Sequence, residues 1–528
     1  MRLLLLPSSN YRHVPGAAPL PAAFPRPTRV DCLLLPMELG ILVRSSRFFP
    51  PPDRTMRTRF DRRSFLNQSA LVAGSLVAAR MLTPSGLARA ADSNEKVNCV
   101  VIGCGGRGGS HIATAAGQNL VALVDADHKR LDAARATAKK KGANADDIQV
   151  FTDYRSMFDK MAKRIDAVFI ATPNHHHALP AMIAMQLGKG VYCEKPLCHT
   201  IGEARELSAM AARYNVATQM GNQGHCQDGY RRLCEYVWAG AVGNITETHS
   251  WTNRANGGIG PRPPASSAPD GLDWEAWIGP APFRDFHVDL HPHEWHGWHD
   301  FGNGSLGNMA CHVLDGVYWA LKLEHPTRVE VEQASGGTDE RYPVGTRIRW
   351  DFPARGPMPA VKVYWYDGRQ GEGDTGDGNK AVPQGPRGKP NTPPQLAELK
   401  KQYPDEEFDS SGTLYVGQRG ILYTGTYGGK MRIVPRKQML VTPEPSQTLP
   451  RPSAVAVDFL RAVREGKTDT AAAFDYSARL TEFTLLGNLA QFAGAGKPVE
   501  WDGPNMKVTN LPELNRWLKQ ENRKGWHV

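Results

Sequence analysis

The stretch KVNCVVIGCGGRGGS, residues 96–110, decides the fold of this chain. Its short apolar run passes directly into a glycine-rich turn, after which a helix is expected to begin. A second apolar strand, Leu120 to Val124, ends in Asp125, twenty residues after Gly105. Such glycines let backbone N–H groups approach a diphosphate at a helix N-terminus, and the acid receives ribose hydroxyls. The order and spacing therefore predict a dinucleotide-binding βαβ unit.

The turn and the acid supply the first candidate cofactor contacts. The set predicted from them is Gly103, Gly105, Gly106, Arg107, Gly108 and Asp125. A carboxylate at the end of the second strand repels a 2′-phosphate, so NAD is favoured over NADP, while Arg107 inside the turn leaves NADP as the alternative. A purely structural glycine turn would not need the acid at this spacing.

Strands and helices continue to alternate as far as Met220. Strands are expected at 150–154, 165–172, 190–193 and 217–220, separated by helices such as 178–187 and 201–214. This pattern predicts an α/β class domain, residues 96–220, with a Rossmann-type doubly wound parallel sheet. Ligands of such sheets lie beyond the carboxyl ends of the strands. Two motifs fall there: Thr172-Pro173-Asn174 with His177, and Glu194-Lys195-Pro196.

A second domain, residues 221–528, is predicted from a change in composition, because all twelve Trp lie beyond residue 237. Its strand-like stretches, at 246–252, 327–333, 346–352, 360–366, 413–416 and 420–424, predict a largely antiparallel sheet in an α+β domain. Helices at 450–466 and 471–492 are expected to close this domain. Residues 367–412, rich in Gly, Pro and charge, are expected to form a long surface excursion rather than an element.

The segment from Gly307 to Asp315 is predicted to be helical, with His312 inside it. Asn308 precedes this histidine by four positions and Asp315 follows it by three, so both are expected to reach the ring. Oxidising an alcohol carbon requires its hydroxyl proton to leave with the hydride, and imidazole titrates near working pH. The alternative interpretation of His312 is a buried structural histidine.

The glycine turn, Thr172-Pro173-Asn174 with His177, Glu194-Lys195-Pro196 and the Gly-x-x-x-Cys-His-x-x-Asp segment together resemble the Gfo/Idh/MocA oxidoreductases, from Lys96 to the C-terminus. The resemblance implies an open second-domain sheet whose face builds homo-oligomers. It also implies that His312 is the acid/base facing the nicotinamide, and that Lys195 holds the same substrate oxygen or the nicotinamide ribose. It adds cofactor contacts at Thr172, Pro173, Asn174, His177, Glu194 and Lys195.

Two positions depart from the family pattern. Family members commonly have Asp where this chain has Asn308, and often Arg at the position of His296. Asparagine can orient an imidazole through its carbonyl oxygen, but it cannot stabilise imidazolium by charge. Asn308 is therefore expected to belong to the catalytic set with Lys195 and His312, at a cost in base strength.

Substrate contacts are expected from a Trp- and His-rich segment without regular period and from residues after the sixth strand. Flat rings near a cleft suit the apolar faces of sugars. The predicted substrate set is Gln223, His225, Trp295, His296, Trp298 and Asp315. The histidines between His287 and His299 raise a metal site as an alternative, but no fixed metal motif is present and none is predicted.

The basic charge of the chain belongs to its leader. Residues 1–90 contain 13 Arg and 4 acidic residues, a charge of +9, which leaves +1 of the total +10 for all the rest. Nucleic-acid binding requires a basic face on the folded body, so a nucleic-acid partner is not expected.

The leader contains an expected export signal. Arg62-Arg63 precedes a moderately apolar run, residues 70–82, and a small-residue cleavage pattern at 88–90. This run is shorter than the roughly 20 residues that span a bilayer, so no stable membrane span is expected after signal removal. Residues 56–91 are predicted to be a twin-arginine signal and the mature protein periplasmic. Residues 1–55 are interpreted as an untranslated or disordered leader.

The sequence thus predicts an NAD-dependent oxidoreductase acting on a secondary hydroxyl of a sugar, cyclitol or sugar derivative. One alternative is a redox-neutral glycosidase that oxidises the sugar, eliminates the anomeric substituent and re-reduces the product. The other is a sugar-binding protein that retains NAD without turnover.

Overall fold

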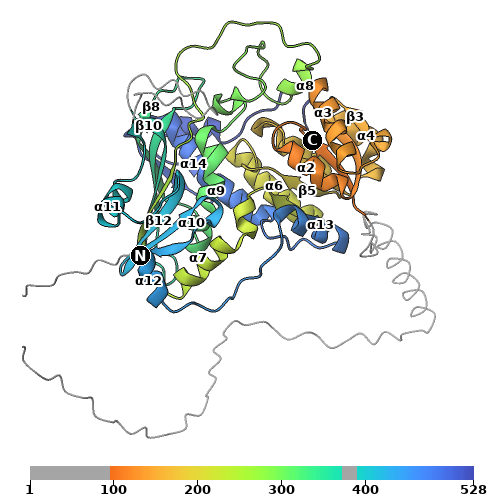
Figure 1. The fold of residues 1–528 in the computed structure, drawn as a ribbon. Helices are drawn as coiled ribbons and strands as arrows, with labels where there is room; N and C mark the ends of the chain where they lie inside the picture. Colours follow the sequence, from red (N-terminus) through yellow and green to blue (C-terminus); the bar gives the residue numbers. More distant parts are fainter. Residues whose placement is uncertain (1–95, 371–388, 528) are drawn as a thin grey trace, which may run out of the picture. The chain divides into compact units, whose positions relative to one another are not determined.

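Six parallel strands form the first sheet, in the order β3-β2-β1-β4-β5-β6. Figure 1 shows this part of the chain in orange to yellow. The computed structural model describes residues 96–370 and 389–527. The strands are β1 (Asn98–Ile102), β2 (Asn119–Val124), β3 (Gln149–Phe151), β4 (Ala167–Ile170), β5 (Gly190–Cys193) and β6 (Thr218–Met220). This order, which reverses between β1 and β4, confirms the predicted doubly wound sheet.

Helices follow these strands and cover both faces of the sheet. They are α2 (Gly108–Ala116), α3 (His128–Lys140), α4 (Tyr154–Met161), α5 (Ala178–Gln186) and α6 (Ile201–Tyr214). The next helix, α7 (Asp228–Trp238), packs instead against residues 315–320 and 420–425. Val100 and Val168 pack on one face with α4, α5 and α6, whereas Val101 and Phe169 pack on the other with α2 and α3. Strands buried on both faces need continuous apolar sequence, which is the pattern that identified them.

The ends of α6 show how local sequence sets these helices. The Thr200 side chain accepts a hydrogen bond from the Glu203 backbone, and the Glu203 carboxylate accepts one from the Thr200 backbone. This capping box satisfies two N–H groups that a helix start leaves open. At the other end, Asn215 adopts a left-handed conformation with φ of 49°, which asparagine tolerates better than most residues.

The second sheet has ten strands, with the order β14-β13-β12-β7-β10-β9-β8-β15-β16 and β11 paired to β10. Only β7 and β10 pair in parallel, so the predicted mostly antiparallel sheet is confirmed. The strands are β7 (Ile245–Thr252), β8 (Arg328–Ser335), β9 (Gly345–Phe352), β10 (Val361–Gln370), β11 (Lys389–Pro390), β12 (Ser411–Gly417), β13 (Gly420–Gly425), β14 (Arg432–Val434), β15 (Val499–Asp502) and β16 (Lys507–Val508).

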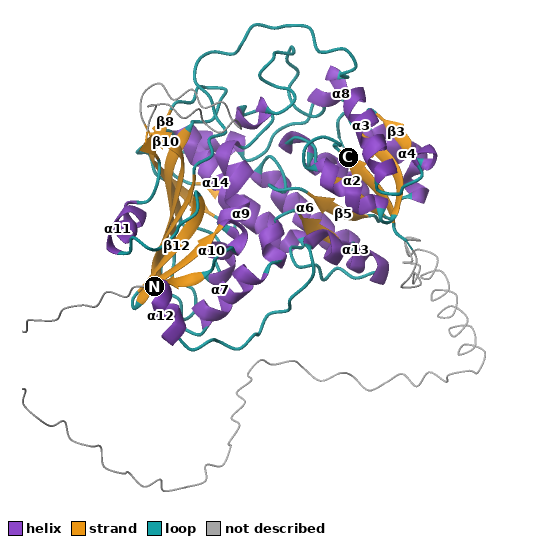
Figure 2. Cartoon of the chain, viewed as in Figure 1, coloured by secondary structure: helices purple, strands orange, loops and turns teal. Residues whose placement is uncertain are grey.

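The long helix α14 (Phe474–Ala493) packs against β8 and α6, beside the second sheet (Figure 2). A Cβ on its Gly487 would lie 2.7 Å from the Trp350 ring, so glycine lets the helix approach the sheet closely. Shorter helices complete the chain: α8 (Trp274–Ile278), α9 (Cys311–Val313), α10 (Asp315–Ala320), α11 (Pro394–Gln402), α12 (Arg436–Val441) and α13 (Val455–Glu465).

Two expectations about the second domain were wrong. Helix α13 does not close that domain: Phe459 and Val463 lie against Gly190 of β5, so the amphipathic α13 covers an apolar face of the first sheet instead. Residues 367–412 are not free of elements, because β10 extends through Gln370 and α11 buries Leu396 and Leu399. Residues 371–388 lie outside the described part of the chain.

The predicted leader and signal, residues 1–55 and 56–91, also lie outside the described residues. The seven described cysteines are all buried and none is in a disulfide. Within 96–370 and 389–527, no helix has the length and apolarity needed to cross a membrane.

Candidate cofactor and active site

Two glycines of the turn after β1, Gly103 and Gly108, have no room for a side chain. Gly103 has φ of 85°, and a Cβ there would lie 2.6 Å from the backbone of Ala171 at the end of β4. A Cβ on Gly108 would lie 2.0 Å from the Gly103 carbonyl oxygen. The turn therefore lies close against β4 and directs the start of α2 at the space beyond the strands, as dinucleotide binding requires.

Asp125 lies at the end of β2, where its carboxylate accepts hydrogen bonds from the backbone N–H groups of Cys104, at 2.8 Å, and Asp127, at 3.0 Å. Burial raises its pKa, although the two N–H groups and Arg130 act in the opposite direction. The Arg130 guanidinium lies 1.5 Å from the position a Cβ on Gly105 would take. Arg130 thus lies over the glycine turn, and the sequence analysis had not identified it.

Arg107 does not face Asp125. Its Nε donates to the Glu194 carboxylate at 2.9 Å, and the His111 ring contacts the same oxygen at 2.9 Å. Burial alone would raise the pKa of Glu194, but His111, Arg107 and Lys195 together lower it to about 2. Glu194 is therefore an ionised carboxylate bound to two neighbours, and Arg107 is turned towards it rather than towards Asp125.

Lys195 extends from the end of β5 to the helical segment that carries His312. Its Nζ donates to the Asn308 backbone carbonyl at 2.9 Å and to Asn308 Oδ1 at 3.3 Å. Burial lowers the pKa of this lysine, and Glu194 opposes that effect. The His177 ring lies between the carbonyl oxygens of Thr172, at 2.9 Å, and Pro196, at 2.7 Å. It joins the ends of β4 and β5 and so fixes the peptide that follows Lys195.

His312 follows a π turn, Leu306–Ala310, and lies in α9. Among the described residues its Nδ1 has no hydrogen-bond partner, and its ring meets the edge of Tyr427 at 4.7 Å between centroids. Burial and then the neighbouring Lys195 lower the pKa of His312 well below its ordinary value. The imidazole is therefore neutral at physiological pH.

The expected contacts of Asn308 and Asp315 with the His312 ring were wrong. The Asn308 amide instead holds Lys195 through Oδ1 and donates through Nδ2 to Asn256 Oδ1 at 2.8 Å. The Asp315 carboxylate, fully buried, accepts hydrogen bonds from His225 Nδ1, Asn222 Nδ2 and the Tyr476 hydroxyl, at 2.9, 3.0 and 2.6 Å. Since buried carboxylates require such donors, Asp315 and His225 form a structural pair away from the cavity.

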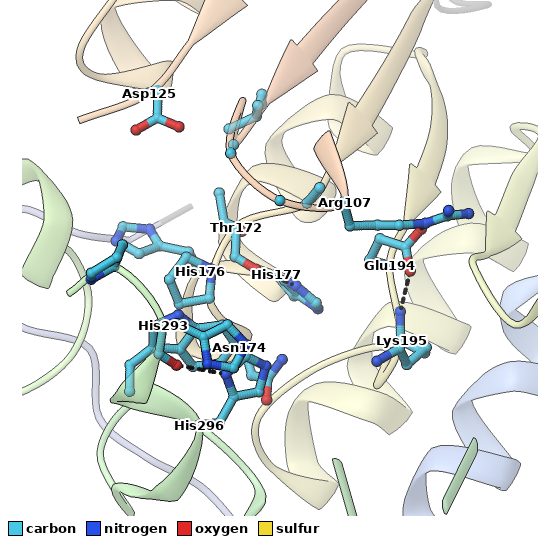
Figure 3. A pocket seen from close by; sticks show the side chains of 18 of the residues that line it. Arg107, Asp125, Thr172, Asn174, His176, His177, Glu194, Lys195, His293 and His296 are labelled. Atoms are coloured by element: carbon cyan, nitrogen blue, oxygen red, sulfur yellow. Dashed lines mark hydrogen bonds and ion pairs between the residues drawn. The ribbon is translucent and has the colours of Figure 1, made fainter. Parts of the chain in front are cut away.

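One cavity of about 690 Å³ brings most of the predicted residues together. Figure 3 shows Asp125 on one side of it and Glu194 with Lys195 on the other, with Thr172 and His177 between them. The predicted residues that line it are Gly103, Gly105, Gly106, Arg107, Asp125, Thr172, Pro173, Asn174, His177, Glu194, Lys195, Gln223, Trp295, His296, Asn308 and His312.

Four predicted residues do not line this cavity: Gly108, His225, Trp298 and Asp315. Gly108 packs against the Gly103 carbonyl and has no side chain to contact a cofactor. Trp298 is fully buried, and its indole N–H donates to the Asp289 carbonyl at 3.2 Å. This tryptophan is therefore part of the protein core and not of the cavity wall. The cavity also has lining residues that the sequence analysis missed, among them Arg130, Arg254, Tyr427 and Trp526.

Part of the cavity wall comes from the segment expected to bind substrate. The Asp273 N–H donates to the Ala126 carbonyl at 2.8 Å, and Arg130 donates to the Pro292 carbonyl at 3.3 Å. His291, His293, Trp295 and His296 of this segment line the cavity. The segment thus lies across the end of β2 and covers the dinucleotide cleft.

The histidines of this segment are not arranged around a metal. His296 stacks on Trp295 with 3.6 Å between ring centroids, and its Nδ1 contacts the His293 carbonyl at 2.8 Å. His287 packs against Trp298, and His299 contacts the Asp339 carbonyl. In the described ranges, no group of three or more His, Cys, Asp or Glu is placed to hold a metal ion.

Two family descriptions match the chain. "Oxidoreductase family, NAD-binding Rossmann fold" of the Gfo/Idh/MocA group matches residues 97–222, and "Oxidoreductase family, C-terminal alpha/beta domain" of the same group matches residues 246–407. The first range contains the first sheet and the motifs at the glycine turn, Thr172 and Glu194. The second range contains the His312 segment and part of the second sheet.

Curated relatives match over part of the chain. Inositol 2-dehydrogenase 2 of Saccharopolyspora erythraea is 32% identical over 193 residues, which is 34% of this chain and 53% of the relative. A glycosyl hydrolase family 109 protein of Solibacter usitatus is 32% identical over 166 residues, 29% of this chain and 36% of the relative. The chain therefore spans only about a third to a half of the length of these relatives.

Among solved structures, the WlbA dehydrogenase of Bordetella pertussis, crystallised with NADH and UDP-GlcNAcA, has a TM-score of 0.50 and 15% sequence identity. The likeness covers 77% of this chain and 99% of that protein. The two proteins therefore share a fold that includes both sheets.

Proposed function

The chain belongs to the Gfo/Idh/MocA oxidoreductase family, and we propose that it oxidises a secondary hydroxyl of a sugar, cyclitol or sugar derivative with NAD. One observation carries the proposal. A neutral, buried His312 and the Lys195 ammonium meet at one end of a cavity whose other end is formed by the glycine turn and Asp125.

The cavity suits NAD on its own geometry. The close packing of Gly103 and Gly108 directs the start of α2 towards the cavity, Arg130 lies over the turn, and Asp125 offers a carboxylate to ribose hydroxyls. These residues would hold the cofactor, which when bound accepts a hydride from the substrate carbon. Because Arg107 is occupied by Glu194, NAD remains favoured over NADP.

His312 would accept the hydroxyl proton, because its imidazole is uncharged and its Nδ1 is not engaged. Lys195 would donate a hydrogen bond to the same oxygen and stabilise negative charge as the proton leaves. His177 would keep Lys195 in place by joining Thr172 and Pro196. The carbon loses a hydride and the oxygen a proton, which gives a carbonyl product.

The test is a screen of sugars and cyclitols with the NAD-loaded protein, read as reduction of the nucleotide. His312→Ala and Lys195→Ala should each abolish reduction while NAD stays bound, and His128→Ala, which changes an exposed histidine, should leave the rate unchanged. If both site variants turn over like the wild type, the assigned site is wrong. Nucleotide that binds but is never reduced would favour the sugar-binding alternative.

A redox-neutral glycosidase is a second candidate, supported by the covered cleft and the similarity to a glycosyl hydrolase family 109 protein. Oxidation of a C3 hydroxyl acidifies the C2 proton, which allows the anomeric substituent to leave, and water addition followed by re-reduction completes glycoside cleavage. Release of a chromogenic aglycone without added NAD would establish this activity. Steady accumulation of NADH on free sugars would argue for the dehydrogenase.

We also propose that the protein is exported to the periplasm by the twin-arginine route, from Arg62-Arg63 and the apolar run that follows. Replacing both arginines by lysine should retain the precursor in the cytoplasm, measured by cell fractionation and blotting. Normal export of the double variant would contradict this route.

A further inference from the structure

Arg254 lies at the reacting end of the cavity without an ionic partner. It follows β7, where its backbone N–H donates to Thr252 Oγ1 at 3.3 Å and its carbonyl accepts from Ser305 Oγ at 3.5 Å, so both sides of its peptide are held. Its side chain is exposed and lines the cavity together with Lys195 and His312. No carboxylate of the described chain forms an ion pair with it.

The other charged groups of the cavity do not balance Arg254. Of the described residues that line the cavity, Glu194 is the one carboxylate at this end, and it is already bound to Arg107 and His111 at 2.9 Å each. The Lys195 ammonium donates to the two neutral oxygens of Asn308.

The remaining lining carboxylates lie elsewhere. Asp125 is on the opposite side of the cavity (Figure 3), and Asp153 pairs with Arg155 at 2.6 Å. Among the described lining residues, Glu194 is thus shared by Arg107, His111 and Lys195, and it leaves the positive charge of Arg254 at the reacting end unbalanced.

Within the framework of the proposed oxidoreductase, we propose that the substrate is an anionic carbohydrate whose carboxylate or phosphate is bound by Arg254. A planar guanidinium matches both groups with two parallel hydrogen bonds. With a neutral sugar bound, the positive charges of Arg254 and Lys195 would repel each other. They would also repel the positive nicotinamide of oxidised NAD. An anion removes this repulsion by placing a negative charge between the two cations.

The cofactor diphosphate is not the partner of Arg254. That diphosphate belongs at the glycine turn, over which Arg130 lies, whereas Arg254 contributes to the electrostatics of Lys195 and His312. Arg254 is also carried by the second domain, after β7, rather than by the dinucleotide-binding sheet. Its replacement should therefore leave NAD binding intact.

The experiment compares matched acid and neutral probes on the NAD-loaded full chain: D-glucuronate with D-glucose, D-galacturonate with D-galactose, and D-glucose 6-phosphate with D-glucose. Dissociation constants come from calorimetry, and nucleotide reduction is followed separately. The variants are Arg254→Gln, Arg254→Lys and, as a control, Arg213→Gln, which changes an exposed arginine of α6 outside the cavity. The uronate and phosphate arms distinguish the two anions.

At least one acid should bind more tightly than its neutral counterpart, and Arg254→Gln should weaken that acid about 10- to 100-fold without changing the neutral probe or NAD. Arg254→Lys should recover part of the loss, and Arg213→Gln should have no effect. Equal binding of every acid and its neutral partner, or an acid preference that survives Arg254→Gln, overturns the proposal. An acid that binds through Arg254 but is never oxidised upholds this inference and contradicts the proposed function. Reduction of NAD by neutral sugars, with no preference for the acids, upholds the proposed function and overturns this inference.

Discussion

Replacing Glu194 by Gln tests whether this carboxylate holds the site together. Glu194 has a side chain only 6% exposed and lies 2.9 Å from both Arg107 Nε and His111 Nε2. Its pKa falls from an ordinary value of 4.5 to about 2 in the folded protein. At about 1.4 kcal/mol per pKa unit, the ionised carboxylate contributes about 3 kcal/mol to the free energy of unfolding. Glutamine keeps the shape and removes this charge.

The sign of the pH dependence follows from the lowered pKa. The contribution of Glu194 is fully present above pH 4.5, where the unfolded chain is ionised, and it is lost as pH falls towards 2. Urea unfolding of wild type and Glu194→Gln should therefore differ by about 3 kcal/mol at pH 7 and converge in acid. Because Glu194 also raises the pKa of Lys195, the variant should lower that pKa further.

Glu482→Gln is the matched control, because Glu482 is a buried carboxylate with a lowered pKa that pairs with Arg205 and His325 outside the cavity. It should reduce stability as well, yet leave the titration of Lys195 unchanged. A stability difference below about 1 kcal/mol at pH 7 for Glu194→Gln, or one that does not shrink in acid, would refute the reasoning.

Three further changes probe the cofactor cleft. Gly108→Ala places a Cβ 2.0 Å from the Gly103 carbonyl oxygen. This variant should lose about 2 kcal/mol of stability in urea unfolding and should bind NAD more weakly in a nucleotide titration. Gly109→Ala is the control, because its Cβ meets nothing within 4 Å and neither property should change. Trp526→Ala opens the cavity wall and should speed release of bound nucleotide about 10-fold in a fluorescence chase; an unchanged rate would show that this ring does not retain it. Lys195→Met removes a charge that lowers the pKa of His312, so NMR titration should find that pKa raised, and a fall would contradict the assigned proximity.

The parts of the site that could be predicted from sequence are those encoded by short stretches. The turn from Gly103 to Gly108 needs glycine for local steric reasons, and Asp125 follows directly from a strand whose apolar run is continuous. Glu194 and Lys195 could be placed because a parallel sheet brings the carboxyl ends of its strands to one edge. The same logic located α6 between Ile201 and Tyr214 as the structure has it.

The parts that could not be predicted depend on contacts between distant segments. Arg254, Tyr427 and Trp526 enter the cavity from three separate places in the sequence, and none lies in a motif. Helical spacing suggested that Asp315 would reach His312, but buried donors on His225, Asn222 and Tyr476 satisfy it instead. Spacing along a helix says which side chains are neighbours, not which of them has a stronger partner elsewhere.

Asn308 shows how a departure from the family pattern acquires a physical meaning in this structure. An aspartate at this position, which family members commonly carry, would place a carboxylate about where Oδ1 now lies, 3.3 Å from Lys195 Nζ, and would neutralise the lysine. The amide holds the same ammonium in place without cancelling its charge, and its Nδ2 remains bound to Asn256. With Arg254 unpaired nearby, the substitution keeps the reacting end cationic. The proposed preference for an anionic substrate thus follows in part from the carboxylate missing at position 308, because a bound anion supplies the negative charge that the protein leaves out.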